Sequence, residues 1–464
     1  MNRWPGKHGP SRRNLLKAMG AGALSLSLVP WAGCTGRSRA KRPNFVFILT
    51  DDHRHDALGC ADHPWIRTPH LDTLADEGVR FSNSFVTTSL CSPSRASFLS
   101  GQYAHSHGVC NNEQDDLPDT VPTFPQALQA AGYRTGFIGK WHMARHAKPR
   151  PGFDHWVAFS RQGGYQRNTL DVNGRWELSE KYVTDDLTDR AENFLADQGP
   201  DPFLLYLSHK AVHAPFQPAQ RHTKLYGDAR MLPAMTPGER LDLKPNWGGR
   251  KPQMERAAHV LDYARTLASV DESVGRIREI LDRQGRLDNT VIIYAGDNGY
   301  LQGEHGGLWD KRAAYEQSIR IPLLIRYPRA FSPGKVCREL ALNLDVAPTI
   351  LGLAGLTPPS EMSGLDLSEM ARGTAARESF LYEYFAEMGS VPTTVAVRTR
   401  EYKYITFPEN PEHTRELYHL RYDPAETDNR IGQKEYSEVL AELESELEAL
   451  KKSTGFVMQS NRTP

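Results

Sequence analysis

The sequence contains no apolar run of the roughly 18 residues needed to cross a bilayer, which excludes a membrane protein with several spans. It also lacks the biased composition of fibrous or disordered chains, since hydrophobic residues make up 39% and charged residues 24%. These values exclude collagen-like, coiled-coil and wholly disordered structures. At 464 residues, the chain is longer than one hydrophobic core usually supports. This length predicts one large domain with a smaller one, or two modest domains.

The chain has no net charge, but its charges are unevenly distributed. Residues 1–42 contain nine Lys and Arg residues and no Asp or Glu, which leaves 47 basic and 56 acidic residues in the remainder. The rest of the chain is mildly acidic and lacks the excess of basic residues that nucleic acid binding requires. We therefore expect no nucleic acid partner.

The basic N-terminal segment has the order of an export signal. Residues 11–17, Ser-Arg-Arg-Asn-Leu-Leu-Lys, precede an apolar stretch at residues 18–29. This order resembles a bacterial twin-arginine signal, which predicts export to the periplasm or cell surface; the alternative is a disordered basic tail. Residues 31–34, Trp-Ala-Gly-Cys, resemble a lipoprotein cleavage box, in which Cys34 would carry the lipid and form the sole membrane anchor.

Cysteine is scarce, with five residues in the whole chain. If Cys34 is lipidated and Cys91 has a chemical role, three remain. These allow one disulfide but exclude a disulfide framework. The five are Cys34, Cys60, Cys91, Cys110 and Cys337.

Five short apolar runs are predicted strands, and polar residues directly follow four of them. Continuous runs of this kind are typical of strands buried on both faces of a parallel sheet. Helical spacing at residues 68–77, 123–131 and 263–284 predicts an α/β fold. Ligands of such folds bind at the carboxyl ends of the strands, although each polar cluster alone could be an ordinary turn. The runs are 44–50, 135–139, 203–208, 291–295 and 321–325, and the residues after the first four include Asp51, Asp52, Lys140, His142, His209, Lys210, His213, Asp297 and Asn298.

The character of the sequence changes near residue 376. Upstream, residues 215–256 are rich in Pro, Gly and Arg without a clear period and predict a long insertion that could cover the site. Downstream, the pattern predicts a hairpin, a short strand and an amphipathic helix. Their ranges are 394–407, 416–420 and 435–451. The predicted organisation is a signal at 1–34, a tether at 35–43, a main domain at 44–375, and a C-terminal subdomain of antiparallel sheet and helix at 376–464.

The sharpest motif is Cys91-Ser92-Pro93-Ser94-Arg95, which continues to Gly101. Ser and Pro followed by helix formers and ended by Gly predict a helix that begins near the cysteine. Backbone N–H groups and the dipole at a helix start favour negative charge, so a nucleophile there would act beside an anion site. Taken alone, the cysteine could instead be a buried structural residue.

The extended motif resembles the signature of the type I sulfatases, which belong to the alkaline phosphatase-like superfamily. That signature is Cys-x-Pro-Ser-Arg, three variable residues, an aliphatic residue, Ser or Thr, and Gly, and residues 91–101 satisfy each specified position. The resemblance begins near Asn44 and also includes Asp-Asp, Gly-Lys-Trp-His, His-Ala-Pro-Phe, Gly-Asp-Asn-Gly and Glu-His-Gly. It implies an α/β/α sandwich with a mostly parallel central sheet, and a sulfuric ester hydrolase.

Three stretches point to a narrower group. Residues 88–91, 152–156 and 208–216 are similar to those of bacterial mucin-desulfating and N-acetylglucosamine-6-sulfatase-like enzymes. This resemblance implies a sulfated glycan, such as N-acetylglucosamine-6-sulfate, as the substrate rather than a small aryl sulfate.

The resemblance implies that a formylglycine-generating or anaerobic maturation enzyme oxidises Cys91 to formylglycine. One hydroxyl of the hydrated aldehyde, a gem-diol, would attack sulfur and displace the alcohol, and the second would later lose its proton and expel sulfate. The implied roles of the other residues are hydrate binding by Arg95, sulfate binding by Lys140 and Lys311, proton removal by His142 and protonation of the leaving alcohol by His213.

The resemblance also implies one calcium ion per chain. The matching residues all offer oxygen, as a hard cation requires, whereas zinc would favour His or Cys. An Asp-Asp pair alone could be a cap or a turn, but two such groups at two strand ends favour a metal site. The implied ligands are Asp51, Asp52, Asp297, Asn298 and the formylglycine formed from Cys91.

Two other interpretations stay open. Phosphonate and phosphate ester hydrolases of the same superfamily share parts of the motif. A catalytically inactive, exported glycan-binding protein is the other alternative, although the set of site residues is intact. Further histidines near the motifs are interpreted as structural or substrate-contacting residues. They are His55, His105, His107, His209 and His305.

Overall fold

The computed structural model describes residues 42–112, 116–143, 147–227, 253–387, 391–411 and 413–459. All of them belong to one compact unit, residues 42–464. The predicted signal, the lipidation box with Cys34 and most of the tether lie outside the described residues, as does the 228–252 part of the predicted insertion.

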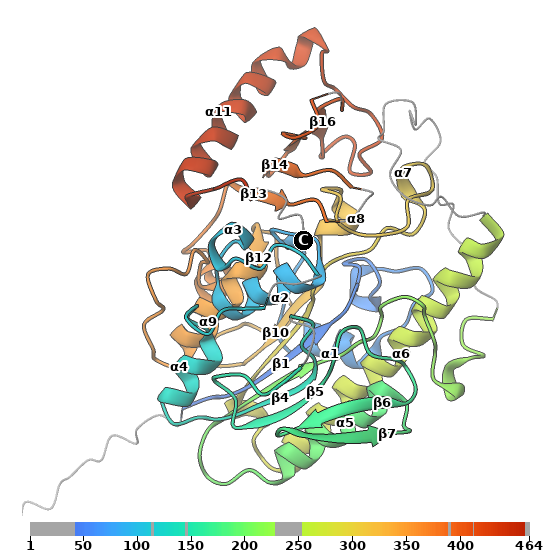
Figure 1. Ribbon diagram of the computed structural model, residues 1–464, viewed down its shortest axis with the longest axis vertical. Helices are drawn as coiled ribbons and strands as arrows, with labels where there is room; N and C mark the ends of the chain where they lie inside the picture. The colour runs from blue at the N-terminus through green and yellow to red at the C-terminus, as the bar shows by residue number, and fades with distance from the viewer. Residues whose placement is uncertain are drawn as a thin grey trace, which may run out of the picture. The chain divides into compact units, whose positions relative to one another are not determined.

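A ten-stranded sheet forms the centre of this unit (Figure 1). Its strand order is β11-β2-β10-β9-β1-β8-β4-β5-β6-β7. The five middle strands, from β9 to β5, run parallel. The bounds are β1 (Asn44–Thr50), β2 (Val79–Phe81), β4 (Arg134–Lys140), β5 (His155–Phe159), β6 (Asn168–Val172), β7 (Arg175–Ser179), β8 (Phe203–Ser208), β9 (Thr290–Gly296), β10 (Leu323–Arg326) and β11 (Lys335–Cys337).

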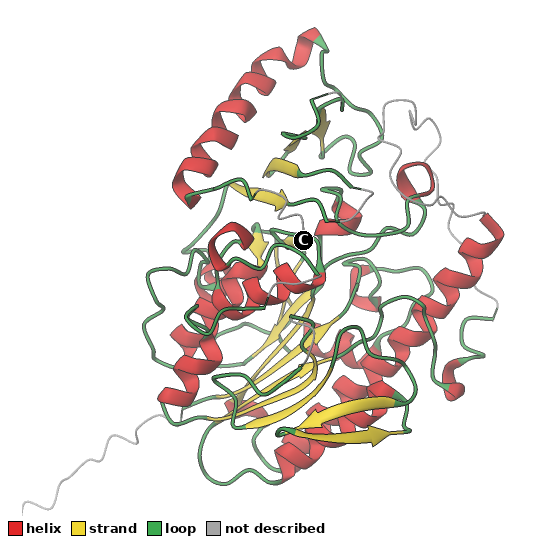
Figure 2. Ribbon diagram, viewed as in Figure 1, coloured by secondary structure: helices red, strands yellow, loops and turns green. Residues whose placement is uncertain are grey.

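Helices cover both faces of the sheet, as the continuous apolar runs predict (Figure 2). Phe45, Phe47 and Leu49 of β1 face one layer, while Val46 and Ile48 face the other. The first layer contains α2 (Cys91–Ser100), α4 (Phe124–Ala130), α9 (Val346–Leu353) and α10 (Leu367–Arg372), and the second contains α1 (Pro69–Asp76), α5 (Val183–Ala196) and α6 (Gln253–Arg283). The predicted α/β/α sandwich is therefore confirmed.

A separate antiparallel sheet lies in the C-terminal part of the chain. It contains β13 (Ser379–Tyr384), β14 (Thr394–Thr399), β15 (Tyr402–Thr406) and β16 (Glu416–His419), and α11 (Ser437–Thr454) packs Leu443 and Leu447 against it. The predicted hairpin, strand and helix are confirmed. The domain boundary near residue 376 stays a prediction.

The five predicted strands are present as β1, β4, β8, β9 and β10. The last differs in direction, because it runs antiparallel to β9. The chain leaves β9 at the carboxyl edge and returns from that same edge, so it must run backwards. The predicted helices are present as α1, α4 and α6. In the described residues, no helix is both long and apolar enough to span a membrane.

The described residues also form three helices of four residues and a pair of short strands. The strands β3 (Ser84–Phe85) and β12 (Ala341–Leu342) pair with one another. The helices are α3 (Ala104–His107), α7 (Glu304–Gly307) and α8 (Glu316–Ile319). Cys60 and Cys337 are free thiols, so they do not form the single disulfide that the sequence allows.

Candidate active site

The polar residues predicted for the site follow the carboxyl ends of neighbouring parallel strands. Leu49 of β1 is in register with Ser208 of β8 and Ala295 of β9, and Ser208 is in register with Gly139 of β4. The residues that follow these positions therefore meet at one edge of the sheet. Asp51, Lys140 and Asp297 are buried there.

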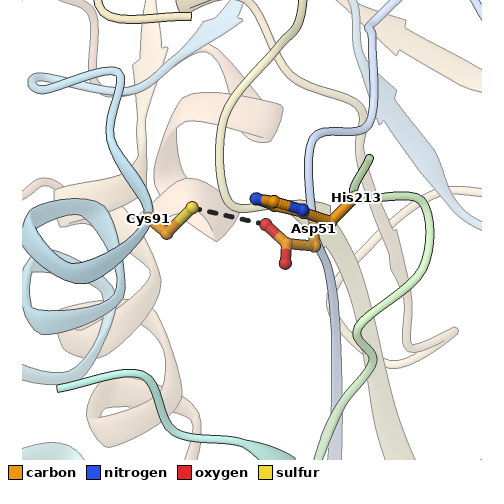
Figure 3. Close-up of side chains that lie close together, drawn as sticks. All are labelled: Asp51, Cys91 and His213. Atoms are coloured by element: carbon orange, nitrogen blue, oxygen red, sulfur yellow. Dashed lines mark hydrogen bonds between the residues drawn. The ribbon is translucent and has the colours of Figure 1, made fainter. Parts of the chain in front are cut away.

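Cys91 begins helix α2, which ends at Gly101 in the left-handed region with φ of 65°. Its Sγ lies 3.4 Å from Asp51 Oδ1 (Figure 3). The same sulfur lies 3.0 Å from Lys311 Nζ. Burial, followed by the negative charge of Asp51, raises the pKa of the thiol to about 12. The cysteine is therefore a neutral thiol near pH 7, and a neutral thiol is a weak nucleophile.

Three carboxylates form the acidic side of the site. One oxygen from each of Asp51, Asp52 and Asp297 lies within 4.8 Å of the others. Burial, followed by the charge of Asp51, raises the pKa of Asp297 to about 7. Asn298 donates from Nδ2 to Asp52 Oδ1 at 2.6 Å, and within the described residues its buried Oδ1 accepts no hydrogen bond. Four oxygen-bearing side chains with an unused buried amide oxygen fit a hard divalent cation.

Three cations surround the carboxylates. Arg95 donates from Nε to Asp297 Oδ2 at 2.9 Å, and its Nη1 donates to the Lys140 carbonyl and to Ser208 Oγ at 2.8 and 2.7 Å. Lys140 Nζ forms an ion pair with Asp51. Lys311 Nζ lies 2.5 Å from Asp52 Oδ1. The site therefore combines positive charge for an anion with carboxylates for a metal.

Burial is the largest influence on the pKa of Asp51 and acts to raise it. Lys140, then His213, Arg95 and Lys311, nevertheless hold the pKa of Asp51 well below its ordinary value. The carboxylate is therefore ionised across the neutral range.

Two histidines flank the reaction centre. A ring nitrogen of His213 lies within 4.8 Å of both an Asp51 oxygen and Cys91 Sγ (Figure 3). His213 Nε2 is 3.9 Å from Asp52 Oδ2. Burial lowers the pKa of His213 to about 4, despite the opposing charge of Asp51. Burial, then Lys140, also holds the pKa of His142 well below its ordinary value. Near pH 7, both rings are neutral in this charge environment.

The structure brings the site residues predicted from the sequence together through short contacts. His142 joins them through Ser92. Ser92, next to Cys91, has its hydroxyl 3.4 Å from His142 Nδ1. Lys311, whose Lys-Arg sequence could have been a solvated pair, is buried against Asp52 and Cys91. The residues in this cluster are Asp51, Asp52, Cys91, Arg95, Lys140, His142, His213, Asp297, Asn298 and Lys311.

The additional histidines have other partners. His107 contacts Ser97 Oγ at 3.0 Å, and His209 contacts Ser273 Oγ at 3.1 Å. His105 Nδ1 lies 2.6 Å from Glu383, and His305 stacks on Tyr315 at 3.9 Å between ring centroids. These partners favour structural roles. His55 instead lines a cavity of about 220 Å³ with Arg320.

Sequence reasoning missed the contacts that support the site. Gln162 Oε1 accepts from Lys140 Nζ at 2.6 Å, and no motif marks this residue. Arg54 donates to Glu304 Oε1 at 2.6 Å and to the Tyr300 carbonyl at 3.0 Å. This link joins the loop after β1 to the loop that leads to Lys311. The Asp-Asp and Glu-His-Gly motifs locate both loops, but a motif does not show that they touch.

Two protein-family models match the chain. The model described as Sulfatase matches residues 43–356. The model described as N-sulphoglucosamine sulphohydrolase, C-terminal, matches residues 303–453. Together the two matches extend over the ten-stranded sheet and the C-terminal antiparallel sheet.

Curated relatives and solved structures agree with these matches. The chain is 32% identical to the N-acetylglucosamine-6-O-sulfatase of Bacteroides thetaiotaomicron, over 92% of this chain and 90% of that protein. It is 31% identical to the human N-acetylglucosamine-6-sulfatase, over 82% of this chain and 74% of that protein. A solved structure in complex with its substrate D-glucosamine-2-N,6-O-disulfate matches with a TM-score of 0.83 and 30% identity, over 91% of this chain and 100% of that chain.

A more distant structure shares the fold. The phosphonate monoester hydrolase of Agrobacterium radiobacter matches with a TM-score of 0.74 and 22% identity, over 89% of this chain and 96% of that chain. At this identity, the match supports the architecture alone. The Sulfatase model and the two relatives, in contrast, cover most of the sequence. The chain therefore belongs to the sulfatase family, within the alkaline phosphatase-like superfamily, and is a sulfuric ester hydrolase.

Proposed function

We propose that the protein removes the 6-O-sulfate from N-acetylglucosamine or glucosamine units of a sulfated glycan. The observation that carries this proposal is the buried cluster in which Cys91, at the start of α2, meets three carboxylates and three cations. The choice of substrate is supported by the names of the two N-acetylglucosamine-6-sulfatase relatives and by the sugar in the similar solved complex.

Cys91 is proposed to act after oxidation to formylglycine, which supplies a nucleophilic hydroxyl when hydrated. Two observations support this modification. The residues from Cys91 to Gly101 match the signature at each specified position. In addition, the pKa of the thiol is raised to about 12, so an unmodified cysteine would carry little thiolate near neutral pH.

Asp51, Asp52, Asp297 and Asn298 are proposed to hold one calcium ion together with residue 91. When bound, the cation would offset the charge of the sulfate and favour ionisation of the nucleophilic hydroxyl. The support is the spacing of the three carboxylates within 4.8 Å and the unpartnered Oδ1 of Asn298. All of these donors are oxygen, which suits calcium better than a softer metal.

The remaining residues are proposed to position the ester and move protons. Lys140 and Lys311 would bind sulfate oxygens, while Arg95 fixes Asp297 and residue 91 in place. His213 would donate a proton to the leaving sugar oxygen, because it lies close to both Asp51 and Cys91. A bound sulfate ester would raise the pKa of His213, since a neighbouring anion favours the protonated ring. His142, which is neutral, would accept the hydroxyl proton when sulfate leaves.

We also propose that the protein is exported by a twin-arginine route and acts in the periplasm or at the cell surface, with Cys34 as a lipid anchor. Support comes from the basic and apolar order of residues 11–34. A formylglycine-generating or anaerobic maturation enzyme would then be a cytoplasmic partner. Fractionation of cells that express the full chain, compared with an Arg12→Lys, Arg13→Lys double variant, tests the route.

Mass spectrometry of the tryptic peptide 81–95, combined with sulfate release from sulfated sugars, tests the catalytic proposal. We expect an aldehyde or its hydrate at residue 91, and sulfate release from N-acetylglucosamine-6-sulfate that is lost on calcium chelation. An aldehyde-bearing protein that releases phosphate or phosphonate but no sulfate would contradict the sulfatase assignment. An unmodified thiol after co-expression with a maturation enzyme would contradict the proposed nucleophile.

A further inference from the structure

We infer that Lys210 binds an anionic group of the sugar other than the sulfate being removed, an inference that rests on the proposed function. Lys210 is two residues beyond the end of β8, at the sheet edge that carries the active site. It is 3% exposed, and its Nζ lies 5.0 Å from the centre of the Tyr165 ring. Among the described residues, no carboxylate forms an ion pair with it.

Other buried lysines of the described chain each have a carboxylate partner. Lys140 pairs with Asp51, Lys311 pairs with Asp52 at 2.5 Å, and Lys403 pairs with Glu426 at 2.6 Å. Moving an ammonium group out of water without a partner is costly, and the face of an aromatic ring recovers a small part of that cost. An anionic ligand would supply the partner that the fold does not.

The charged residues of the site affect the pKa of Lys210. Burial, then the positive charge of Lys140, lowers the pKa of Lys210 to about 8, while Asp51 and Asp52 act in the opposite direction. The ammonium group therefore lies near these residues in a region that already contains positive charge. Such a region favours the binding of an anion.

Tyr165 indicates which side of the ester Lys210 faces. Its ring lies under Lys210 Nζ, and its hydroxyl donates to the His213 carbonyl at 2.7 Å. His213 is the proposed donor to the leaving sugar oxygen, so Lys210 lies toward the sugar. Lys140 and Lys311 contact the carboxylates around Cys91 and so serve the reacting sulfate. An N-sulfate or a carboxylate on the sugar is the chemical group that would fit beside Lys210.

Calorimetry on the Cys91→Ala protein separates binding from turnover. The probes are glucosamine-2-N,6-O-disulfate and N-acetylglucosamine-6-sulfate, which share the reacting group and differ in the charge at position 2. We expect Lys210→Met to weaken binding of the disulfate by about tenfold or more, as expected for the loss of one charge-assisted hydrogen bond, and binding of the monosulfate less than about twofold. Lys210→Arg should retain most of the difference between the two sugars.

Lys181→Met is the matched control, because Lys181 is exposed and pairs with Asp189 at 2.5 Å. It should leave both affinities unchanged. Equal weakening for both sugars, or no weakening for either, would overturn the role of Lys210. A third probe, a 6-sulfated sugar with a carboxylate in place of the N-sulfate, decides which anion is preferred. Failure of the wild-type protein to release sulfate from either sugar would instead contradict the proposed function, and binding of neither sugar would count against both.

Discussion

The molecule contains two buried clusters of charge that are built differently. The first lies at the edge of the large sheet, around Asp51 and Asp297. The second lies between α8 and the C-terminal sheet, where Lys403 Nζ contacts Glu426 at 2.6 Å, Glu316 at 2.9 Å and the Ala314 carbonyl at 2.7 Å. The backbone N–H of Glu316 donates to Glu426 Oε2 at 2.7 Å. Each of these charges in the second cluster is bonded to other parts of the chain.

At the first cluster and next to it, two polar groups have bonding capacity that the described residues do not use. Within the described residues, Asn298 Oδ1 accepts no hydrogen bond and Lys210 has no carboxylate partner. Asn298 contacts Asp52, and Lys210 follows β8 at the same edge of the sheet. Closed networks fix one packing arrangement, whereas unfilled bonding capacity is typical of a site that a ligand completes. The comparison predicts that changes in the first cluster reduce catalysis, and changes in the second reduce stability.

The largest effect is expected for Cys91→Ala in the first cluster. Turnover should fall by about 10⁴-fold or more, because the substitution removes the proposed nucleophile. Among the described residues the thiol contacts the side chains of Asp51 and Lys311, so its removal should change the unfolding midpoint little. Sulfate release and thermal unfolding measure the two quantities. Substantial remaining activity in a preparation free of the wild-type protein would exclude residue 91 as the nucleophile.

His213→Ala should lower turnover of glycan sulfates by about 10³-fold, within the range for general acid catalysis. The loss should be much smaller for nitrophenyl sulfate, since nitrophenolate leaves without protonation. His209→Asn is a useful control, because His209 contacts Ser273 rather than the reaction centre. Comparison of kcat/KM for the two classes of ester measures the effect. Equal losses would assign His213 to binding or structure instead of proton transfer.

Lys403→Met tests the second cluster. The substitution removes the buried ammonium group that pairs with both Glu316 and Glu426, although Glu316 keeps Arg398 at 3.3 Å, and it should lower the free energy of unfolding by about 3–5 kcal/mol. The kcat of the folded fraction should stay near the wild-type value. Urea unfolding measures stability, and Lys434→Met at an exposed lysine is the control. A stable variant with reduced kcat would reverse the roles of the two clusters.

The sequence predicts the first cluster better than the second for a physical reason. Residues of the active site follow apolar strands, and parallel strands bring their carboxyl ends together, so Asp51 and Asp297 could be placed near each other. Glu316, Lys403 and Glu426 lie on separate elements without a shared motif, and their contacts depend on how the C-terminal sheet packs. The sequence also could not predict that Lys210 has no carboxylate partner among the described residues, because this depends on the positions of all neighbouring carboxylates. The sequence also did not predict that β10 runs antiparallel to β9, because that depends on whether the connecting loop crosses to the other edge of the sheet.

Glu304→Gln should give the smallest effect. It tests whether Glu304 supports catalysis, as the first cluster does, or stability, as the second does. Glu304 accepts from Arg54, and its other oxygen accepts from the Gln302 backbone at 2.5 Å. Arg54 also forms two hydrogen bonds with Asp56 at 2.8 and 2.7 Å, so the substitution loosens this link without removing it. Supporting residues of this kind typically change metal affinity or activity by about 10- to 100-fold.

We expect the lower end of that range for Glu304→Gln, about tenfold in both calcium affinity and kcat/KM, because the loop that leads to Lys311 is held less firmly. Calcium titration of sulfate release measures both quantities. Glu279→Gln serves as the control, since Glu279 is exposed and its nearest ion pair, with Arg283, spans 3.7 Å. Unchanged calcium affinity with a lower unfolding midpoint would place Glu304 with the stabilising cluster. A loss in calcium affinity at unchanged stability would show that the catalytic cluster extends through Arg54 beyond the residues that touch the metal.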